Sequence, residues 1–191
     1  MLIRKSMTTL KNLLSIFSAK KPSYHKTVNA TATRLQDELD KYEADIISKK
    51  TFLTRSQKIL SKAYKTAYKS GSGVSGYSEL GQEWLDEFSN SQFSFLAKFA
   101  DDIENGLGSM DTDARMKMYA DSVKSAWYAG STLESDDGTL FDWVLGDAEN
   151  CEDCVGRSEN GPYTLDGLPG FPGDGSTVCM ANCKCSIVRS N

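Results

Sequence analysis

Cysteine is absent from the first 150 residues of this 191-residue chain, and histidine occurs only once, at His25. A catalytic zinc usually has histidine or carboxylate ligands and a general base nearby. Neither the H-E-x-x-H motif nor the deaminase pair H-x-E and P-C-x-x-C is present. We therefore expect no hydrolytic or deaminating centre and no enzyme, and we place His25 on the surface.

Long apolar runs are missing as well. No stretch of eighteen apolar residues occurs, so we expect no membrane span. Lys11 and Asn12 interrupt the apolar part of the N-terminal segment, so we expect no cleavable secretory signal.

The net charge of −4 hides an uneven distribution of charge. Residues 1–70 carry fifteen Lys and Arg against five Asp and Glu, whereas residues 71–191 carry seven against twenty-one. The basic part either faces an acidic partner or forms a solvated basic surface.

The cysteines that are present lie close together in sequence, in C-E-D-C and in C-M-A-N-C-K-C. Two cysteines separated by two residues can bind one ion, and a second group about 25 residues later can complete a tetrahedron. We predict a structural zinc ion bound by four of the five. The candidates are Cys151, Cys154, Cys179, Cys183 and Cys185.

Two alternatives to zinc are a disulfide scaffold and inert free thiols. An odd number of cysteines and the absence of a secretory signal argue against disulfides. The spacing leaves open which four bind. Residues 161–176 between the two groups are rich in glycine and proline and can bury little apolar surface. A structural zinc contributes about 10–16 kcal/mol in small modules, which is enough to order such a segment.

Before the cysteines, the sequence predicts helices. Residues 1–26 form a basic amphipathic arm whose helix, with Ile3, Met7 and Leu10 on one face, ends at Pro22. This helix suits a partner subunit, a membrane surface or a nucleic acid, and the partner subunit demands least of it. A helical domain follows over 27–131. It opens with a heptad pattern at Val28, Ala32, Leu35, Leu39, Tyr42 and Ile46.

Three further helices are expected in this domain, beginning after the N-caps Thr54, Ser78 and Asp111. Glycines 71, 106 and 130 are expected to end them. The aromatic residues of the helix after Ser78 are expected in the core. The helix after Thr54 has a basic row that suits an acidic neighbour or a polyphosphate: Arg55, Lys58, Lys62, Lys65 and Lys69.

Two short motifs complete the pattern. Residues 71–76 match G-x-G-x-x-G, but a helical pattern precedes them where a dinucleotide site needs a strand, so we interpret them as a hinge. In the last region, 132–191, residues 139–145 have a strand pattern with Phe141, Trp143 and Leu145 on one side, and they can pair with residues 185–188. The predicted fold is mainly α: an elongated helical bundle with a small C-terminal zinc-stapled β appendage.

The C-terminal residues resemble the signature of tailed-phage minor head proteins, the Mu F-like head-morphogenesis family. In that signature a tryptophan strand precedes C-x-x-C, a Tyr and Leu-Pro loop, a histidine or cysteine, and N-C-[RK]-C with an aliphatic residue. The matching positions are Trp143, Cys151, Cys154, Tyr163, Leu168, Pro169, Cys179, Asn182, Cys183, Lys184, Cys185 and Ile187. Relatives often have His-Pro before Asn-Cys, where this chain has Cys179-Met180-Ala181. Helical phrases around Ala67 and Gln92 extend the likeness to about residues 50–191.

The resemblance implies a structural component of the virion head or neck, assembled in the bacterial cytoplasm and present in several copies. Its partners would be capsid, portal or neck subunits, and its basic N-terminal helices could contact packaged DNA. A zinc-dependent nucleic-acid-binding regulator is the alternative. Only Arg157, Lys184 and Arg189 provide positive charge near the cysteines, which argues against that module as the part that binds DNA.

Overall fold

A computed structural model describes residues 24–106 and 111–190. The predicted helix of the arm 1–26 lies outside the described residues. Of the arm, the structure describes residues 24–26, which form the start of the first described helix. In the described ranges no helix is both long enough and apolar enough to cross a membrane.

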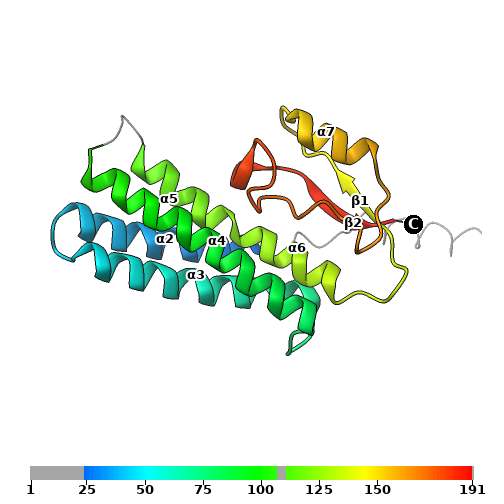
Figure 1. Cartoon of the computed structure of the whole chain (residues 1–191), viewed down its shortest axis with the longest axis horizontal. Helices are drawn as coiled ribbons and strands as arrows, with labels where there is room; N and C mark the ends of the chain where they lie inside the picture. Colours follow the sequence, from blue (N-terminus) through cyan, green and yellow to red (C-terminus); the bar gives the residue numbers. More distant parts are fainter. Residues whose placement is uncertain (1–23, 107–110, 191) are drawn as a thin grey trace, which may run out of the picture.

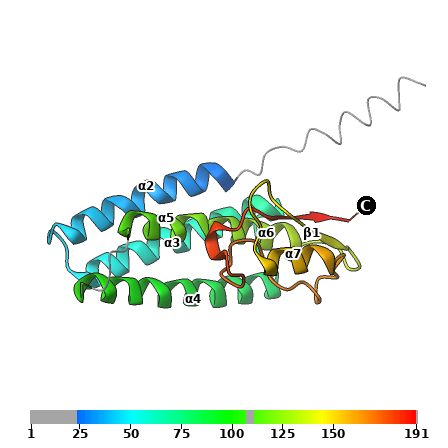
Figure 2. The same cartoon turned by 90° about the horizontal axis from the view of Figure 1, so that it is seen from above.

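The described chain is mainly helical, as predicted, and elongated (Figure 1). The elements are α2 (Tyr24–Glu43), α3 (Lys49–Ser72), α4 (Glu79–Glu104), α5 (Thr112–Asp121), α6 (Val123–Leu133), β1 (Phe141–Val144), α7 (Glu152–Glu159), the 3-10 helix η1 (Met180–Asn182) and β2 (Ser186–Arg189). Helices α2, α3 and α4 run along the long axis beside α5 and α6, which follow one another end to end, and Figure 2 shows α2 and α4 on opposite sides of the group. The C-terminal part, residues 140–190 with the two short strands, lies beside α6.

The heptad pattern of α2 correctly predicts that Leu35, Leu39 and Tyr42 are buried. Its last member, Ile46, is 72% exposed, so this part of the prediction is wrong. The helix ends at Glu43, and Asp45 takes a left-handed conformation with φ of 56°, which turns the chain away before Ile46.

The start of α3 also differs from the prediction. Ser48, and not Thr54, is its N-cap, because the Ser48 hydroxyl accepts a hydrogen bond from the N–H of Thr51. Thr54 lies inside the helix, and its hydroxyl donates to the carbonyl of Lys50 at 2.8 Å. At the other end Gly73, with φ of 71°, caps the helix.

Helix α4 begins after Ser78, as predicted, with the Ser78 hydroxyl accepting from the N–H of Gly81 at 3.0 Å. Phe88 and Phe99 are buried in the core. Phe95 remains 39% exposed, so the aromatic row only partly coincides with the buried face.

Asp111 caps α5 as predicted, but the expected single helix is divided at Ser122. The Ser122 hydroxyl donates to the carbonyl of Tyr119 at 2.7 Å and also meets the Tyr64 hydroxyl at 3.0 Å. A side chain that binds a helix carbonyl competes with the backbone ladder and bends the helix. Gly130 does not end α6, which continues to Leu133. Instead, Gly130 lies directly against the backbone of Tyr68 on α3.

Glu134 connects the ends of three helices. Its carboxylate accepts from the Tyr68 hydroxyl at 2.7 Å and from the N–H of Ser78 at 2.8 Å. Burial alone would raise the pKa of this carboxyl, but the N–H of Ser78 and the hydroxyl of Tyr68 outweigh it and lower the pKa below its ordinary value of 4.5.

Glu134→Gln is expected to lower the free energy of unfolding by about 1 kcal/mol at pH 7. Because the folded-state pKa is depressed, this contribution is present above pH 4.5 and is lost as the pH falls through the folded-state pKa. Urea unfolding at pH 7 and at about pH 3 should therefore show the wild type and the variant converging in acid. Glu87→Gln, at an exposed carboxylate of α4, is the control. A difference that persists undiminished in acid would contradict the role given to Glu134.

The predicted strand pairing is confirmed. β1 and β2 are antiparallel, with Trp143 opposite Ile187, and Phe141 and Trp143 are buried beneath the sheet. Leu145 lies beyond the strand and is 37% exposed.

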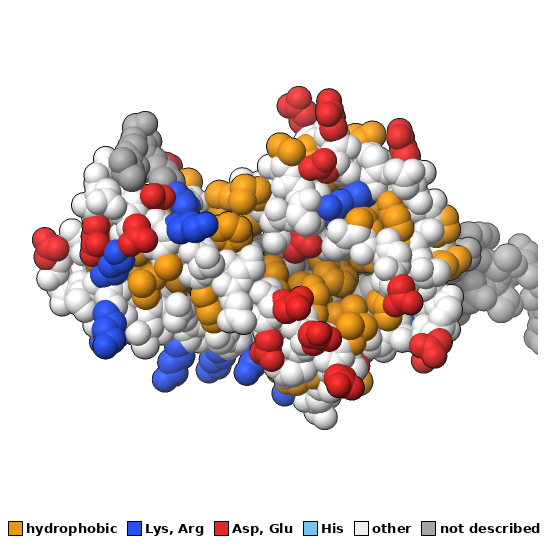
Figure 3. Space-filling model, viewed as in Figure 1, with side chains coloured by type: hydrophobic (Ala, Val, Ile, Leu, Met, Phe, Trp, Pro, Cys, Tyr) orange, Lys and Arg blue, Asp and Glu red, His pale blue; other side chains and the backbone are white. Residues whose placement is uncertain are grey.

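In Figure 3, Lys and Arg side chains follow the lower edge of the bundle. Asp and Glu side chains gather over the right-hand part, and others lie at the left end of the bundle.

Candidate metal centre

The C-terminal part is attached to the bundle by both apolar and polar contacts. Phe171 is buried, and its ring meets Trp84 of α4 edge-on with the ring centroids 5.3 Å apart. The Ser125 hydroxyl of α6 donates to the carbonyl of Pro172 at 2.9 Å. Residues 161–176, which were expected to bury little apolar surface, therefore contribute Phe171 to the core.

Lys124 makes the deepest of these connections. Its side chain is buried, and its Nζ donates to the carbonyls of Ala181, at 2.7 Å, and Cys183. Burial lowers the pKa of this ammonium, while the neighbouring Cys183 thiol acts in the opposite direction. Lys124 therefore fixes the backbone within η1 and directly after it, and brings a cationic group next to the cysteines.

The first two cysteines lie at the start of a helix that the sequence analysis did not predict. Cys151 is the N-cap of α7, and Cys154 lies in its first turn. This spacing brings both thiols to the same end of the helix, where the free N–H groups favour negative charge.

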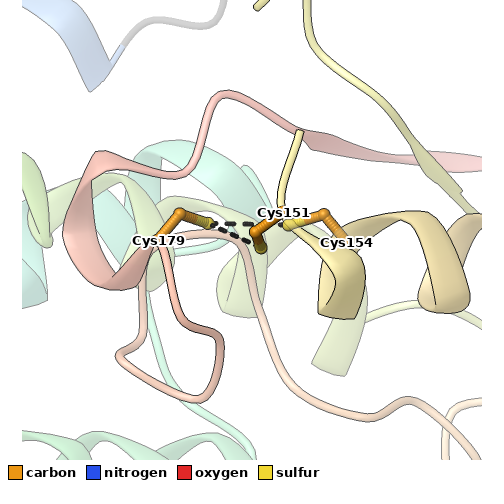
Figure 4. Close-up of side chains that lie close together, drawn as sticks. All are labelled: Cys151, Cys154 and Cys179. Carbon is orange, nitrogen blue, oxygen red and sulfur yellow. Dashed lines mark hydrogen bonds between the residues drawn. The ribbon is translucent and has the colours of Figure 1, made fainter. Parts of the chain in front are cut away.

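The five cysteines converge, and Figure 4 shows how Cys151, Cys154 and Cys179 lie close together. The Sγ atom of Cys179 lies 3.6 Å from those of both Cys151 and Cys154, and the Cys154 Sγ also lies 3.6 Å from that of Cys183. The sulfurs form two groups of three, and within each group all Sγ atoms lie within 4.8 Å of one another. Cys154 belongs to both groups, one with Cys151 and Cys179 and the other with Cys183 and Cys185. All five cysteines are free thiols, and the separations greatly exceed the roughly 2.05 Å of a disulfide.

These separations suit a metal ion. Four sulfurs at about 2.3 Å from a tetrahedral ion lie about 3.8 Å from one another. The three separations of 3.6 Å join Cys151, Cys179, Cys154 and Cys183 in one chain of contacts. The Cys185 Sγ instead has the amide oxygen of Asn150 at 3.6 Å. The clustered cysteines can hold a metal ion, and Cys154 is central to the group.

The thiols differ in acidity. The N–H of Cys154 is the main cause that lowers the pKa of the Cys151 thiol to about 7; burial opposes it, and the N–H of Cys179 adds to it. Burial raises the pKa of the Cys154 thiol strongly and that of Cys183 to about 12. A bound cation must displace the protons of these two thiols, so metal affinity should increase with pH.

Side chains of the C-terminal part also order the chain around the cysteines. The Asp153 carboxylate accepts from the N–H of Val178 at 2.8 Å, one residue before Cys179. The Arg157 guanidinium lies over the Trp143 ring at 4.9 Å and donates to Ser176. These contacts connect α7 with β1 and with the approach to the second cysteine group.

Sequence reasoning missed Lys124 and Asn150. Lys124 follows Ala120 by four residues and precedes Trp127 by three, so it lies on the apolar stripe of its helix. A lysine on such a stripe indicates a buried charge and could have been noticed in the sequence. Asn150 offers no such signal. His25 is exposed on α2, as expected.

The chain was compared with protein-family models, with curated proteins and with solved structures. It matches none of them.

Proposed function

We propose that this protein is a structural component of a tailed-phage virion, in the head or neck, where it acts through contacts with capsid, portal or neck subunits. The observation that supports this most is the convergence of the cysteines on Cys154, at the positions that carry the resemblance to minor head proteins. Tyr163 of the same signature donates from its hydroxyl to the carbonyl of Arg157 at 2.7 Å, and Arg157 covers Trp143. Arg157 thus connects Tyr163 and Trp143 of the signature.

The ion in this proposal is Zn²⁺ in a structural role. Thiolates at tetrahedral separations suit zinc, and an all-sulfur set leaves no open position for water. We propose Cys151, Cys154, Cys179 and Cys183 as the ligands, with Cys185 next to them. Zinc would then keep residues 151–185 rigid against α6, so that the C-terminal part presents a fixed surface to a neighbouring subunit.

Mass spectrometry of purified phage particles tests the function. The chain should be present in nuclease-resistant particles at a fixed ratio to the major capsid subunit. Cys154→Ser should abolish incorporation, whereas Cys185→Ser should preserve it. A chain found only outside the particles would contradict the proposal.

The rival function is a zinc-dependent nucleic-acid-binding regulator. It requires DNA binding that depends on the cysteine region, so Cys154→Ser should abolish DNA binding if this alternative holds. The exposed charges near the cysteines argue against it, because acidic groups predominate there: Asp147, Glu149, Glu152, Asp153, Glu159 and Asp166.

A further inference from the structure

Helices α2 and α3 carry a basic surface that the proposed function does not use. One hollow of about 250 Å³ lies between them, and a second of about 420 Å³ lies along α3. Lys62 and Thr66 line both hollows, so the two are neighbours on the surface. We name the two hollows together the α2–α3 groove, and its cations are Lys26, Arg34, Lys58, Lys62, Lys65 and Lys69.

These cations have no acidic partners among the described residues. Elsewhere on the bundle cations are paired: Lys41 with Asp37, and Lys117 with Asp121, both at 2.5 Å. Arg55, the first cation of the predicted basic row, pairs with Glu38. In contrast, within ranges 24–106 and 111–190 no carboxylate lies within 4.0 Å of any groove cation.

Unpaired like charges at helical spacing repel one another and lower the stability of the helix. All six are exposed, and neither hollow includes an Asp or Glu in its lining. A polyanion in the groove would remove this repulsion, so the arrangement favours an anionic partner.

The lining distinguishes a nucleic acid from an acidic protein. Protein interfaces are built around aromatic, Met and Arg side chains and contain few lysines. The groove offers lysines together with the hydroxyls of Thr27, Ser61 and Thr66, which are the side chains that bind phosphate oxygens in protein–DNA complexes. From Lys58 to Lys69 the row extends about 16 Å along α3, which is about the axial length of five base pairs of a duplex.

We propose that the α2–α3 groove binds the phosphate backbone of double-stranded nucleic acid without reading its sequence. Lysines of α3 follow one strand, and Lys26 and Arg34 approach from α2. This inference does not depend on the cysteines or on the proposed virion function, and Cys154→Ser should retain the binding.

Fluorescence anisotropy of the full chain with a labelled 25-base-pair duplex of arbitrary sequence tests the proposal between 50 and 200 mM salt. With about six phosphate contacts, log K should fall against log salt with a slope of about −5. The double variant Lys62→Gln/Lys65→Gln should reduce the magnitude of the slope by about 2. Lys41→Gln/Lys117→Gln removes the same charge from paired positions outside the groove and should leave the slope unchanged.

Three results would overturn the proposal. The first is the absence of salt-dependent duplex binding by the full chain. The second is an equal loss of binding in the two double variants, which would indicate attraction to overall charge without a site. The third is displacement of the duplex by polyglutamate at an equal concentration of charge, which would identify an acidic protein segment as the better partner. Circular dichroism should confirm that both variants fold.

Discussion

Cys154→Ser is expected to leave the chain without a bound metal and to unfold residues 140–190 while α2–α6 remain folded. Cys154 is the one cysteine shared by both groups of sulfurs, so its loss breaks the proposed tetrahedron whichever other thiols take part. A structural zinc contributes about 10 kcal/mol or more to folding. The apolar residues of the C-terminal part cannot replace this contribution, because its sheet has only two strands. The bundle keeps the part of the hydrophobic core that its own helices form, with Leu39, Leu60 and Phe99.

Elemental analysis and limited proteolysis measure this effect. The wild type should contain about one zinc per chain and resist cleavage between Cys154 and Cys179, and both properties should be lost in the variant and after chelation. Cys185→Ser is the matched control and should retain the metal. A metal-free chain that still resists proteolysis would contradict the structural role of the ion. Complete loss of metal in Cys185→Ser would instead show that the proposed ligand set is wrong.

Local signals in the sequence predicted much of the bundle correctly. Ser78 and Asp111 each precede a helix and accept a hydrogen bond from the third residue beyond, so cap chemistry alone located these starts. The same reasoning placed a cap at Thr54, where the structure has none, because a threonine can cap a helix or lie inside it with its hydroxyl bonded to a carbonyl.

The cysteine region was predictable in composition but not in geometry. The spacing indicated an ion, and the structure brings all five cysteines together. The sequence did not indicate α7, because Gly156 and the C-x-x-C spacing are also typical of a loop. Nor could it reveal that Lys124 of α6 reaches the carbonyls of Ala181 and Cys183. Such contacts depend on how the C-terminal part docks on the bundle.

The roles of two glycines were misjudged for a related reason. Gly71 and Gly130 were expected to end helices or to act as a hinge, since glycine commonly does both. In the structure a β-carbon at Gly71 would collide with the carbonyl of Trp127, and one at Gly130 with the carbonyl of Tyr68. Helices α3 and α6 therefore approach closely at a reciprocal pair of glycines, a feature that only the pairing of distant helices reveals.

Gly130→Ala is consequently expected to lower the free energy of unfolding by about 3 kcal/mol, at the upper end of the usual overpacking cost. The atoms in the way belong to the backbone of Tyr68 and cannot rotate aside as a side chain would, so α3 and α6 must separate. Their separation also loosens the packing of Tyr64 and Tyr68, which are fully buried. Thermal unfolding should show a decrease in Tm of about 10 °C for a chain of this size.

Gly76→Ala provides the matched comparison. Gly76 lies in the connection between α3 and α4 and has no positive φ, and a β-carbon added there would meet no other atom within 4 Å. The same added methyl group should there be neutral or stabilise by about 0.4–1 kcal/mol, because alanine restricts the unfolded chain. If both variants melted alike, the close approach of α3 and α6 would be refuted. A large difference between them would instead show that the absence of a side chain at residue 130 allows α6 to lie close to α3. This close approach sets the position of α6, which contains Lys124 and contacts the cysteine region.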